Sequence, residues 1–207
     1  NVDSVDNIGE IKIDQVAIGS CTNSSYADLM KVAQILKGRK VHPDVSLVIS
    51  PGSSKILTKL AENGALAVMI SAGARIIENA CGPCIGMGQS PKSGAVSLRT
   101  FNRNFKGRSG TLDASVYLVS PETAAISAVT GVLTNGAKTD AVLTEILPEF
   151  FPKNDNFIVY PEGTDKTNTE VEMGPNIKPF PRNVALPETV TAKVALHPGD
   201  NITTDDI

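Results

Sequence analysis

The chain has 207 residues, of which 41% are hydrophobic, and a formal net charge of −3 at pH 7. This length is enough for one sizeable hydrophobic core. The sequence has no basic run and only 4% aromatic residues, which argues against binding of nucleic acid through its backbone or by base stacking. No segment approaches the roughly 18 consecutive apolar residues that a membrane-spanning helix requires.

In the first part of the chain, 1–135, apolar runs rich in β-branched residues alternate with amphipathic stretches. The apolar runs predict buried strands, and the amphipathic stretches, several of them preceded by serine and followed by glycine, predict helices. The predicted strands cover 15–20, 45–50, 66–73, 94–100 and 114–120. The predicted helices cover 24–38, 51–64, 73–80 and 120–131.

Alternation of this kind predicts an α/β fold with a mostly parallel sheet covered by helices, a three-layer arrangement. Such folds bind ligands at the carboxyl ends of their strands. Cys21, Ser50 and Ser120 each stand at or just after the end of a predicted strand. We therefore expect the functional site at that edge of the sheet and regard 1–135 as one domain.

The composition changes in the second part of the chain, 136–207. A helix is predicted over 140–151, a Pro-rich extended arm or interdomain linker after it, and one further strand over 189–200. The chain begins without methionine and ends in a polar stretch, so we expect it to be a piece of a longer protein.

The three cysteines are too few for a disulfide framework and indicate a reducing compartment, the cytoplasm or, in a eukaryote, the mitochondrial matrix. Cys81 and Cys84 form a Cys-x-x-Cys pair, which is compatible with a redox pair, half of a zinc site or an iron–sulfur site. Zinc requires four ligands, and the sequence offers no convincing fourth. Cysteines can also be small buried hydrophobic residues. The Gly, Ser, Thr, Asn and Pro residues around Cys21 and the pair favour exposed loops whose N–H groups face anionic sulfides.

Three thiolates on a cubane iron–sulfur cluster would leave one iron without a cysteine ligand. Such an iron can act as a Lewis acid, so this count favours catalysis over electron transfer. Arg103 and Arg108, in the segment "TFNRNFKGRSG", could bind a di- or tricarboxylate bidentately. For an isolated pair of arginines, a solvated loop with surface charge is clearly the better explanation.

The polar end of the chain, "GDNITTDDI", contains Asp200, Asp205 and Asp206. These carboxylates could form a polar turn, a helix N-cap or a group prone to bind metal. Taken alone, the segment is explained by an ordinary turn.

Several motifs together resemble those of the aconitase family, in the order in which the family has them. They are "IGSCTNSSYADL", "PGSSKI", "CGPCIGMG", "FNRNFKGRSG", "VYLVSPETAAISAVTG" and "GDNITTDDI". The resemblance covers nearly the whole chain. It implies the third domain of such an enzyme with the start of the linker to the fourth.

The resemblance implies a [4Fe-4S] cluster held by Cys21, Cys81 and Cys84. It also implies that Asn102 lies near the cluster and that Arg103 and Arg108 bind substrate carboxylates. At the end of the chain, Asp205 matches the acid of the family's "TTDH" motif, which supports a histidine on a domain absent here. Asp206 stands where the family commonly has that motif's histidine, and this departure puts the role of the segment in doubt.

The reaction implied is the interconversion of citrate and isocitrate through cis-aconitate, as in the tricarboxylic acid cycle. The family's catalytic base is a serine of the fourth domain, so we expect this chain alone to be inactive and to need the remaining domains. Alternatives are the sister hydro-lyases, isopropylmalate isomerase and homoaconitase, and an RNA-binding regulatory relative. The expected small-molecule partner is a tricarboxylate.

Overall fold

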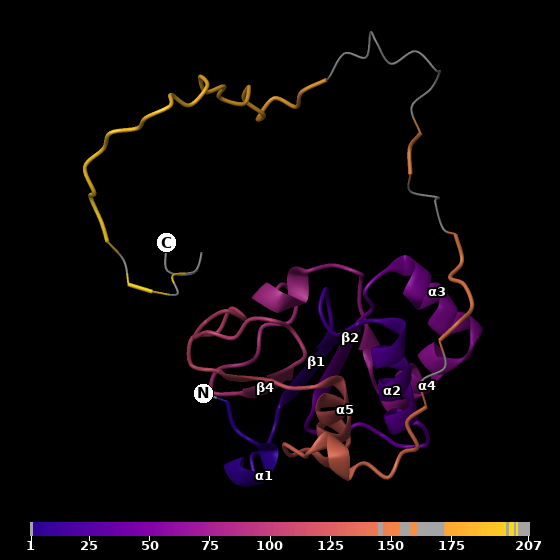
Figure 1. The fold of residues 1–207 in the computed structure, drawn as a ribbon. Coiled ribbons are helices and arrows are strands. Elements are labelled where there is room, and N and C mark those ends of the chain that lie inside the picture. The colour runs from indigo at the N-terminus through magenta and orange to yellow at the C-terminus, as the bar shows by residue number, and fades with distance from the viewer. Residues whose placement is uncertain are drawn as a thin grey trace. The chain divides into compact units, whose positions relative to one another are not determined.

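The computed structural model describes residues 2–144, 147–153, 158–160, 172–197, 199–200 and 202. The chain divides into two compact units, Asn1–Val159 and Tyr160–Ile207. Within the described residues, every helix and strand belongs to the first unit (Figure 1).

Five parallel strands form one sheet in the described part of the first unit, in the order β3-β2-β1-β4-β5. The strands are β1 (Gln15–Gly19), β2 (Ser46–Ser50), β3 (Arg75–Ile76), β4 (Val96–Arg99) and β5 (Ser115–Leu118). Because β1 is central and its neighbours follow later in the chain, the sheet extends outward from β1 in both directions.

Helices connect and surround these strands, which confirms the expected α/β fold with a parallel sheet. The α-helices among the described residues are α1 (Val5–Ile8), α2 (Tyr26–Leu36), α3 (Ser54–Glu62), α4 (Ala65–Ala72) and α5 (Pro121–Thr130). Two short 3₁₀ helices are also present, η1 (Gly82–Ile85) and η2 (Gly136–Lys138). The sequence analysis did not predict α1, which is a single turn.

Side chains along β1 alternate between two hydrophobic clusters, as the period of a strand requires. Val16 and Ile18 lie in the larger cluster, to which α2, α4 and α5 contribute buried side chains. Ala17, between them, lies in a smaller cluster with Cys84 and Phe101. The turn that carries Cys84 therefore packs on the second face of the sheet.

The ends of two predicted helices are fixed by their own side chains. Ser25 and Asp28 form a capping box at the start of α2, in which the Ser25 Oγ accepts a hydrogen bond from the Asp28 N–H at 3.1 Å. Ser120 caps α5, Pro121 occupies its first turn, and Gly131 ends it with a φ of 80°. Both helices confirm the predictions within a few residues.

The predictions for 66–73 and 73–80 were wrong, because their secondary structure is exchanged. The apolar run expected to be a strand is helix α4, and the segment expected to be a helix contains the short strand β3. An apolar run of eight residues has no periodicity that separates a buried strand from a buried helix. The helix starts where the Asn63 side chain accepts a hydrogen bond from the Ala65 N–H at 2.9 Å, and it ends at Gly73, whose φ is 107°.

The predicted helix over 140–151 is absent from the described residues of that range. The chain instead packs against helices of the core. The Gln34 side chain pairs with the backbone of Thr144 through hydrogen bonds of 3.1 and 3.0 Å. The Phe151 ring meets the Tyr26 ring edge-on, with centroids 5.8 Å apart. These contacts with α2 take the place of the hydrogen bonds of a helix.

The described residues of the second unit form neither helix nor strand, so the strand predicted over 189–200 is not formed by its described residues. Residues 172–197 are all exposed, and a strand needs a partner to satisfy its backbone groups. The extended Pro-rich arm is confirmed. The domain boundary after residue 135 stays a prediction.

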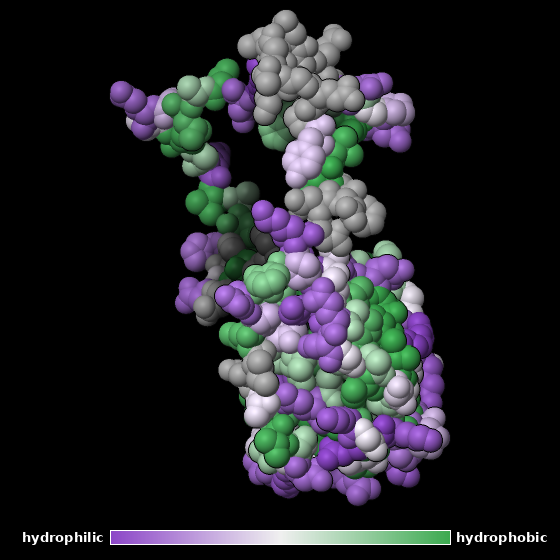
Figure 2. Space-filling view, turned by 90° about the vertical axis from the view of Figure 1, so that its right-hand side faces the viewer, coloured by the Kyte–Doolittle hydropathy of each residue, from purple (hydrophilic) through white to green (hydrophobic). Residues whose placement is uncertain are grey.

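Hydrophobic and hydrophilic residues are mixed on the face of the molecule that Figure 2 shows. On the first unit, exposed apolar side chains include Ile70 of α4 and Phe150, which are 53% and 70% exposed. The Lys59 ammonium lies 5.5 Å from the centre of the Phe150 ring. In the part of the chain that the structure describes, no helix is both long and apolar enough to cross a membrane.

Candidate functional site

The segment with Cys21 leaves the carboxyl end of the central strand β1 and is attached there to the segment that follows β4. The Gly19 N–H donates a hydrogen bond to the Thr100 Oγ1 at 2.9 Å, and the Asn23 side chain donates to the Thr100 carbonyl oxygen. These bonds bring the first cysteine segment next to the start of the arginine loop, which we define as residues 100–110. Cys21 and the start of the arginine loop therefore lie together at the carboxyl ends of β1 and β4.

The backbone before Cys21 is held in unusual conformations. Gly19 has a φ of 116°, and a Cβ there would lie 1.9 Å from the Ser50 carbonyl oxygen, so only glycine fits. Ser20 also has a positive φ, 62°, and is 4% exposed. Its Oγ makes no hydrogen bond within the described residues, although it lies close enough to the Cys21 thiol to help lower that thiol's pKa. Strain and an unpartnered hydroxyl next to a cysteine are typical of functional sites.

The other two cysteines share the turn that contains η1, which we call the cysteine turn and define as residues 81–89. The Cys84 N–H donates to the Cys81 carbonyl oxygen at 3.3 Å, which closes the turn. Cys81 is exposed, whereas Cys84 is 3% exposed. All three cysteine thiols of the chain are free.

The cysteine turn approaches the arginine loop so closely that one contact excludes any side chain. Gly86 has a φ of 84°, and a Cβ there would lie 2.0 Å from the carbonyl oxygen of Ser109. Ser109 is itself buried. The two segments are thus in direct backbone contact at Gly86, and Arg108 is held beside the turn.

The surroundings of Cys21 favour the ionised form of its thiol. The pKa of Cys21 is lowered, mainly by the Thr22 hydroxyl, 3.7 Å from the sulfur, and less strongly by Ser20 and the Cys81 side chain. The Arg108 guanidinium donates a hydrogen bond to the Cys84 sulfur at 3.8 Å. Thiolates are the form of cysteine that binds metal.

The structure brings the side chains of Cys21 and Cys81 near each other and places Cys84 on the same turn as Cys81. Among the described residues, no three His, Cys, Asp or Glu side chains are gathered closely enough to hold a metal ion. The chemistry of the donor set nevertheless fits an iron–sulfur group, because thiols are soft ligands and all three are free.

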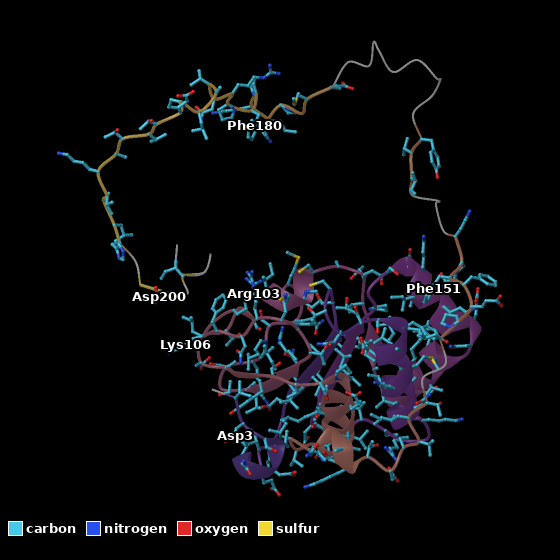
Figure 3. All side chains as sticks on the ribbon, viewed as in Figure 1. Asp3, Arg103, Lys106, Phe151, Phe180 and Asp200 are labelled. Atoms are coloured by element: carbon cyan, nitrogen blue, oxygen red, sulfur yellow. The ribbon has the colours of Figure 1, made fainter. Side chains whose placement is uncertain are left out.

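The predicted carboxylate-binding residues belong to the arginine loop, on which Figure 3 labels Arg103 and Lys106. Asn102 and Arg103 are exposed. The Arg108 guanidinium stacks over the Phe105 ring at 5.6 Å, and its Nε is buried without a hydrogen-bond partner in the described residues. The loop therefore presents one exposed arginine and one partly buried arginine.

Asp205 and Asp206 lie outside the described residues, so the role predicted for Asp205 stays a prediction. The roles predicted for Asn102, Arg103 and Arg108, and for the three cysteines as metal ligands, are likewise predictions.

The sequence analysis missed one buried residue at this edge, Arg99 of β4, which is 1% exposed. It lay inside a predicted strand and was given no role. A charged residue within a predicted buried strand was the available signal, because charge is seldom buried without a specific partner.

Comparison with known proteins is consistent with this site. The aconitase family (aconitate hydratase) matches residues 2–131. The chain is 52% identical to the 3-isopropylmalate dehydratase large subunit of Moorella thermoacetica over 133 residues, 63% of this chain and 31% of that protein. It is 45% identical to the methanogen homoaconitase large subunit of Methanocaldococcus jannaschii over 136 residues, 65% of this chain and 32% of that protein. The homoaconitase large subunit of Thermus thermophilus is 46% identical over 137 residues, 64% of this chain and 33% of that protein.

The chain spans about a third of the length of these relatives. The family match covers more than half of the chain, including the three cysteines and the arginine loop. The chain therefore belongs to the aconitase family.

Proposed function

We propose that this chain is the cysteine-bearing part of an aconitase-family hydro-lyase of the isopropylmalate dehydratase and homoaconitase class. One observation carries the proposal: the guanidinium of Arg108, a carboxylate-binding candidate, contacts the sulfur of Cys84, an iron-ligand candidate, at 3.8 Å. A hydro-lyase that acts on a hydroxy acid needs both functions in one site, one for the carboxylates and one for the hydroxyl group.

The relatives named above favour the sister hydro-lyases over the citrate reaction that the sequence analysis took as its main interpretation. They are large subunits of 3-isopropylmalate dehydratase and homoaconitase, so they give no support to a role in the tricarboxylic acid cycle. The RNA-binding alternative gains nothing from a net charge of −3.

In this proposal Cys21, Cys81 and Cys84 hold a [4Fe-4S] cluster as thiolates. When bound, a cluster with three protein ligands supplies an iron with an open position, which acts as a Lewis acid toward the substrate's hydroxyl group. The three free thiols favour a reducing compartment, such as the cytoplasm, for the protein.

The residues of the arginine loop bind and orient the substrate. Arg103 is exposed and can bind an outer carboxylate, and Arg108 can bind a second carboxylate beside the cysteine turn. Asn102 is exposed next to them and can donate to the substrate or to the group at the cysteines.

The catalytic base of the proposed reaction lies elsewhere in the assembled enzyme, on further domains of a longer chain or on a small subunit. The "large subunit" names of the relatives favour such a partner. Asp205 retains its proposed role as support for a histidine on another domain. The chain alone is then expected to bind its cluster and a substrate but not to turn it over.

The experiment that tests the proposal uses the chain reconstituted anaerobically with iron and sulfide. The electron paramagnetic resonance spectrum of the reduced cluster is recorded with and without 3-isopropylmalate, cis-homoaconitate and citrate. A spectrum that changes with any of these acids, and much less in Arg108→Lys than in a matched Arg39→Lys control, supports the joint site. A cluster spectrum that none of the acids alters contradicts it.

The substrate class is tested on the longer protein that contains this chain, by hydration rates of cis-unsaturated acids. We expect a higher kcat/KM with the isopropyl-substituted or homologous acid than with cis-aconitate. A clear preference for cis-aconitate would return the assignment to the citrate reaction.

A further inference from the structure

Arg99 is the largest fully buried side chain of the described residues, with 1% exposure. It stands at the end of β4, next to the arginine loop, and its side chain lies beneath the cysteine turn. The guanidinium donates four hydrogen bonds. They reach the Pro83 carbonyl at 2.6 Å, the Gln89 carbonyl at 2.6 Å, the Gln15 Oε1 at 2.9 Å and the Ser97 Oγ at 3.1 Å.

Two of these bonds hold the cysteine turn at separate points. Pro83 lies between Cys81 and Cys84, and Gln89 is the last residue of the turn. Gln15, at the start of β1, supports the same arrangement, because its side chain also donates to the Gln89 carbonyl at 3.3 Å. One planar guanidinium thus fastens the turn to strands β1 and β4, a geometry that the fork of arginine suits better than the point charge of lysine.

The charge of Arg99 has no carboxylate partner among the ion pairs of the described residues. Burial lowers the pKa of Arg99 to about 10, against the opposing influence of Cys84, so the guanidinium is still protonated at neutral pH. Its centre also lies 5.6 Å from the Phe101 ring. A buried charge without a counter-ion is costly, and the four hydrogen bonds of the guanidinium hold this charge beneath the cysteine turn.

Arg99 differs from Arg108 in a way that separates their roles. Arg108 is partly exposed and sits on the loop, where a substrate can reach it. Arg99 lies beneath the turn with 1% exposure and can act only through the residues above it.

We propose that Arg99 is a positioning residue, which holds the cysteine turn in place and supplies the buried positive charge that an anionic iron–sulfur group at Cys84 requires. The first half of this inference concerns the chain alone. The second half rests on the proposed function.

The test compares the wild-type chain with Arg99→Lys, which keeps the charge but not the fork, and Arg99→Gln, which removes both. Arg39→Gln is the matched control: Arg39 donates to the Ile35 carbonyl at 3.0 Å and pairs with Asp140, away from the cysteine turn. Far-UV circular dichroism first confirms that each variant folds.

The first readout is hydrogen exchange of the cysteine-turn amides in the metal-free chain. The N–H groups of Gly86, Met87 and Gln89 are bonded within the turn at 3.1, 3.0 and 2.9 Å. We expect these amides to exchange at least about tenfold faster in Arg99→Gln, with Arg99→Lys in between and the control unchanged. Exchange at the wild-type rate in both Arg99 variants would overturn the positioning role.

The second readout is the reduction potential of the reconstituted cluster, which a merely structural residue would not move. Loss of a buried positive charge disfavours the more negative, reduced state. We expect a lower potential in Arg99→Gln and a value near wild type in Arg99→Lys. A wild-type potential in a cluster-loaded Arg99→Gln chain would overturn the charge role.

The two readouts keep the inference separate from the proposed function. If the wild-type chain binds no iron and sulfide, the proposed cluster is contradicted and the charge role with it, while exchange still decides the positioning role. If Arg99→Gln does not fold, Arg99→Lys provides the test. Faster hydrogen exchange of the cysteine-turn amides, with an unchanged reduction potential of the cluster, then supports both roles of Arg99.

Discussion

Gly86→Ala is the change that tests most sharply how the cysteine turn meets the arginine loop. A methyl group at this position would lie 2.0 Å from the Ser109 carbonyl oxygen and 2.6 Å from the Ser90 Oγ. The backbone carbonyl cannot rotate away, so one of the two segments has to move. Gly88→Ala is the matched control, because its φ of 65° is also positive but nothing lies within 4 Å of the added methyl group.

The expected loss of stability follows from the difference between the two sites. Both substitutions place alanine in the left-handed region, which costs about 1–2 kcal/mol. Only Gly86→Ala adds a clash in a packed region, which costs about 1–3 kcal/mol more. We therefore expect the free energy of unfolding to fall by about 1–2 kcal/mol in Gly88→Ala and by about 2–5 kcal/mol in Gly86→Ala.

Urea unfolding of the metal-free chain, followed by far-UV circular dichroism, measures both values. Separation of the two segments would also displace the cysteine turn, which carries Cys81 and Cys84, so Gly86→Ala should hold less iron after reconstitution than Gly88→Ala. Equal losses of stability in the two variants, within about 0.5 kcal/mol, would refute the argument that Gly86 is required by this close approach.

Three further changes test other parts of the structure. Ser25→Ala removes the capping box with Asp28 and should lower the free energy of unfolding by about 1 kcal/mol, measured by urea unfolding. The pKa of Asp14 is lowered, mainly by its hydrogen bond to Lys92. The carboxylate of Asp14 therefore contributes its full stabilisation above the ordinary pKa of 3.8, and this stabilisation is lost as the pH falls through the lowered pKa. In Asp14→Asn, stability measured by thermal unfolding should therefore depend less steeply on pH in this acid range. Arg108→Lys should bind iron normally yet need at least about tenfold more substrate to change the cluster spectrum.

Each of these expectations has a result that would contradict it. Unchanged stability in Ser25→Ala would mean that water replaces the cap at no cost. An equally steep acid loss in Asp14→Asn would place the titrating group elsewhere. Wild-type substrate affinity in Arg108→Lys would mean that Arg108 does not bind a substrate carboxylate.

The sequence predicts the central part of the fold because the signals there are local. Ser25 and Ser120 cap the helices that they precede, and the β-branched runs of β1 and β2 have no competing interpretation. Helix α4 could not be recognised in the same way. Its residues are apolar on nearly all sides, and only packing against α2 and α3 decides between helix and strand.

Some features of the candidate site could likewise be predicted from the sequence, and others could not. Cys21 could be placed at the end of a strand from the sequence alone, and Cys81 and Cys84 could be recognised as a motif. The contact of Gly86 with Ser109 and the bonds of Arg99 to the turn could not, because they join segments that are distant in sequence and depend on tertiary packing.

The most direct test of the whole account is the iron and sulfide content of the chain after anaerobic reconstitution, for the wild type and for Cys21→Ser, Cys81→Ser and Cys84→Ser. The account predicts about four irons and four sulfides per wild-type chain and a marked loss in each of the three variants. A wild-type chain without iron and sulfide, or one whose content survives any of the three substitutions, would contradict the claim that these cysteines hold the cluster.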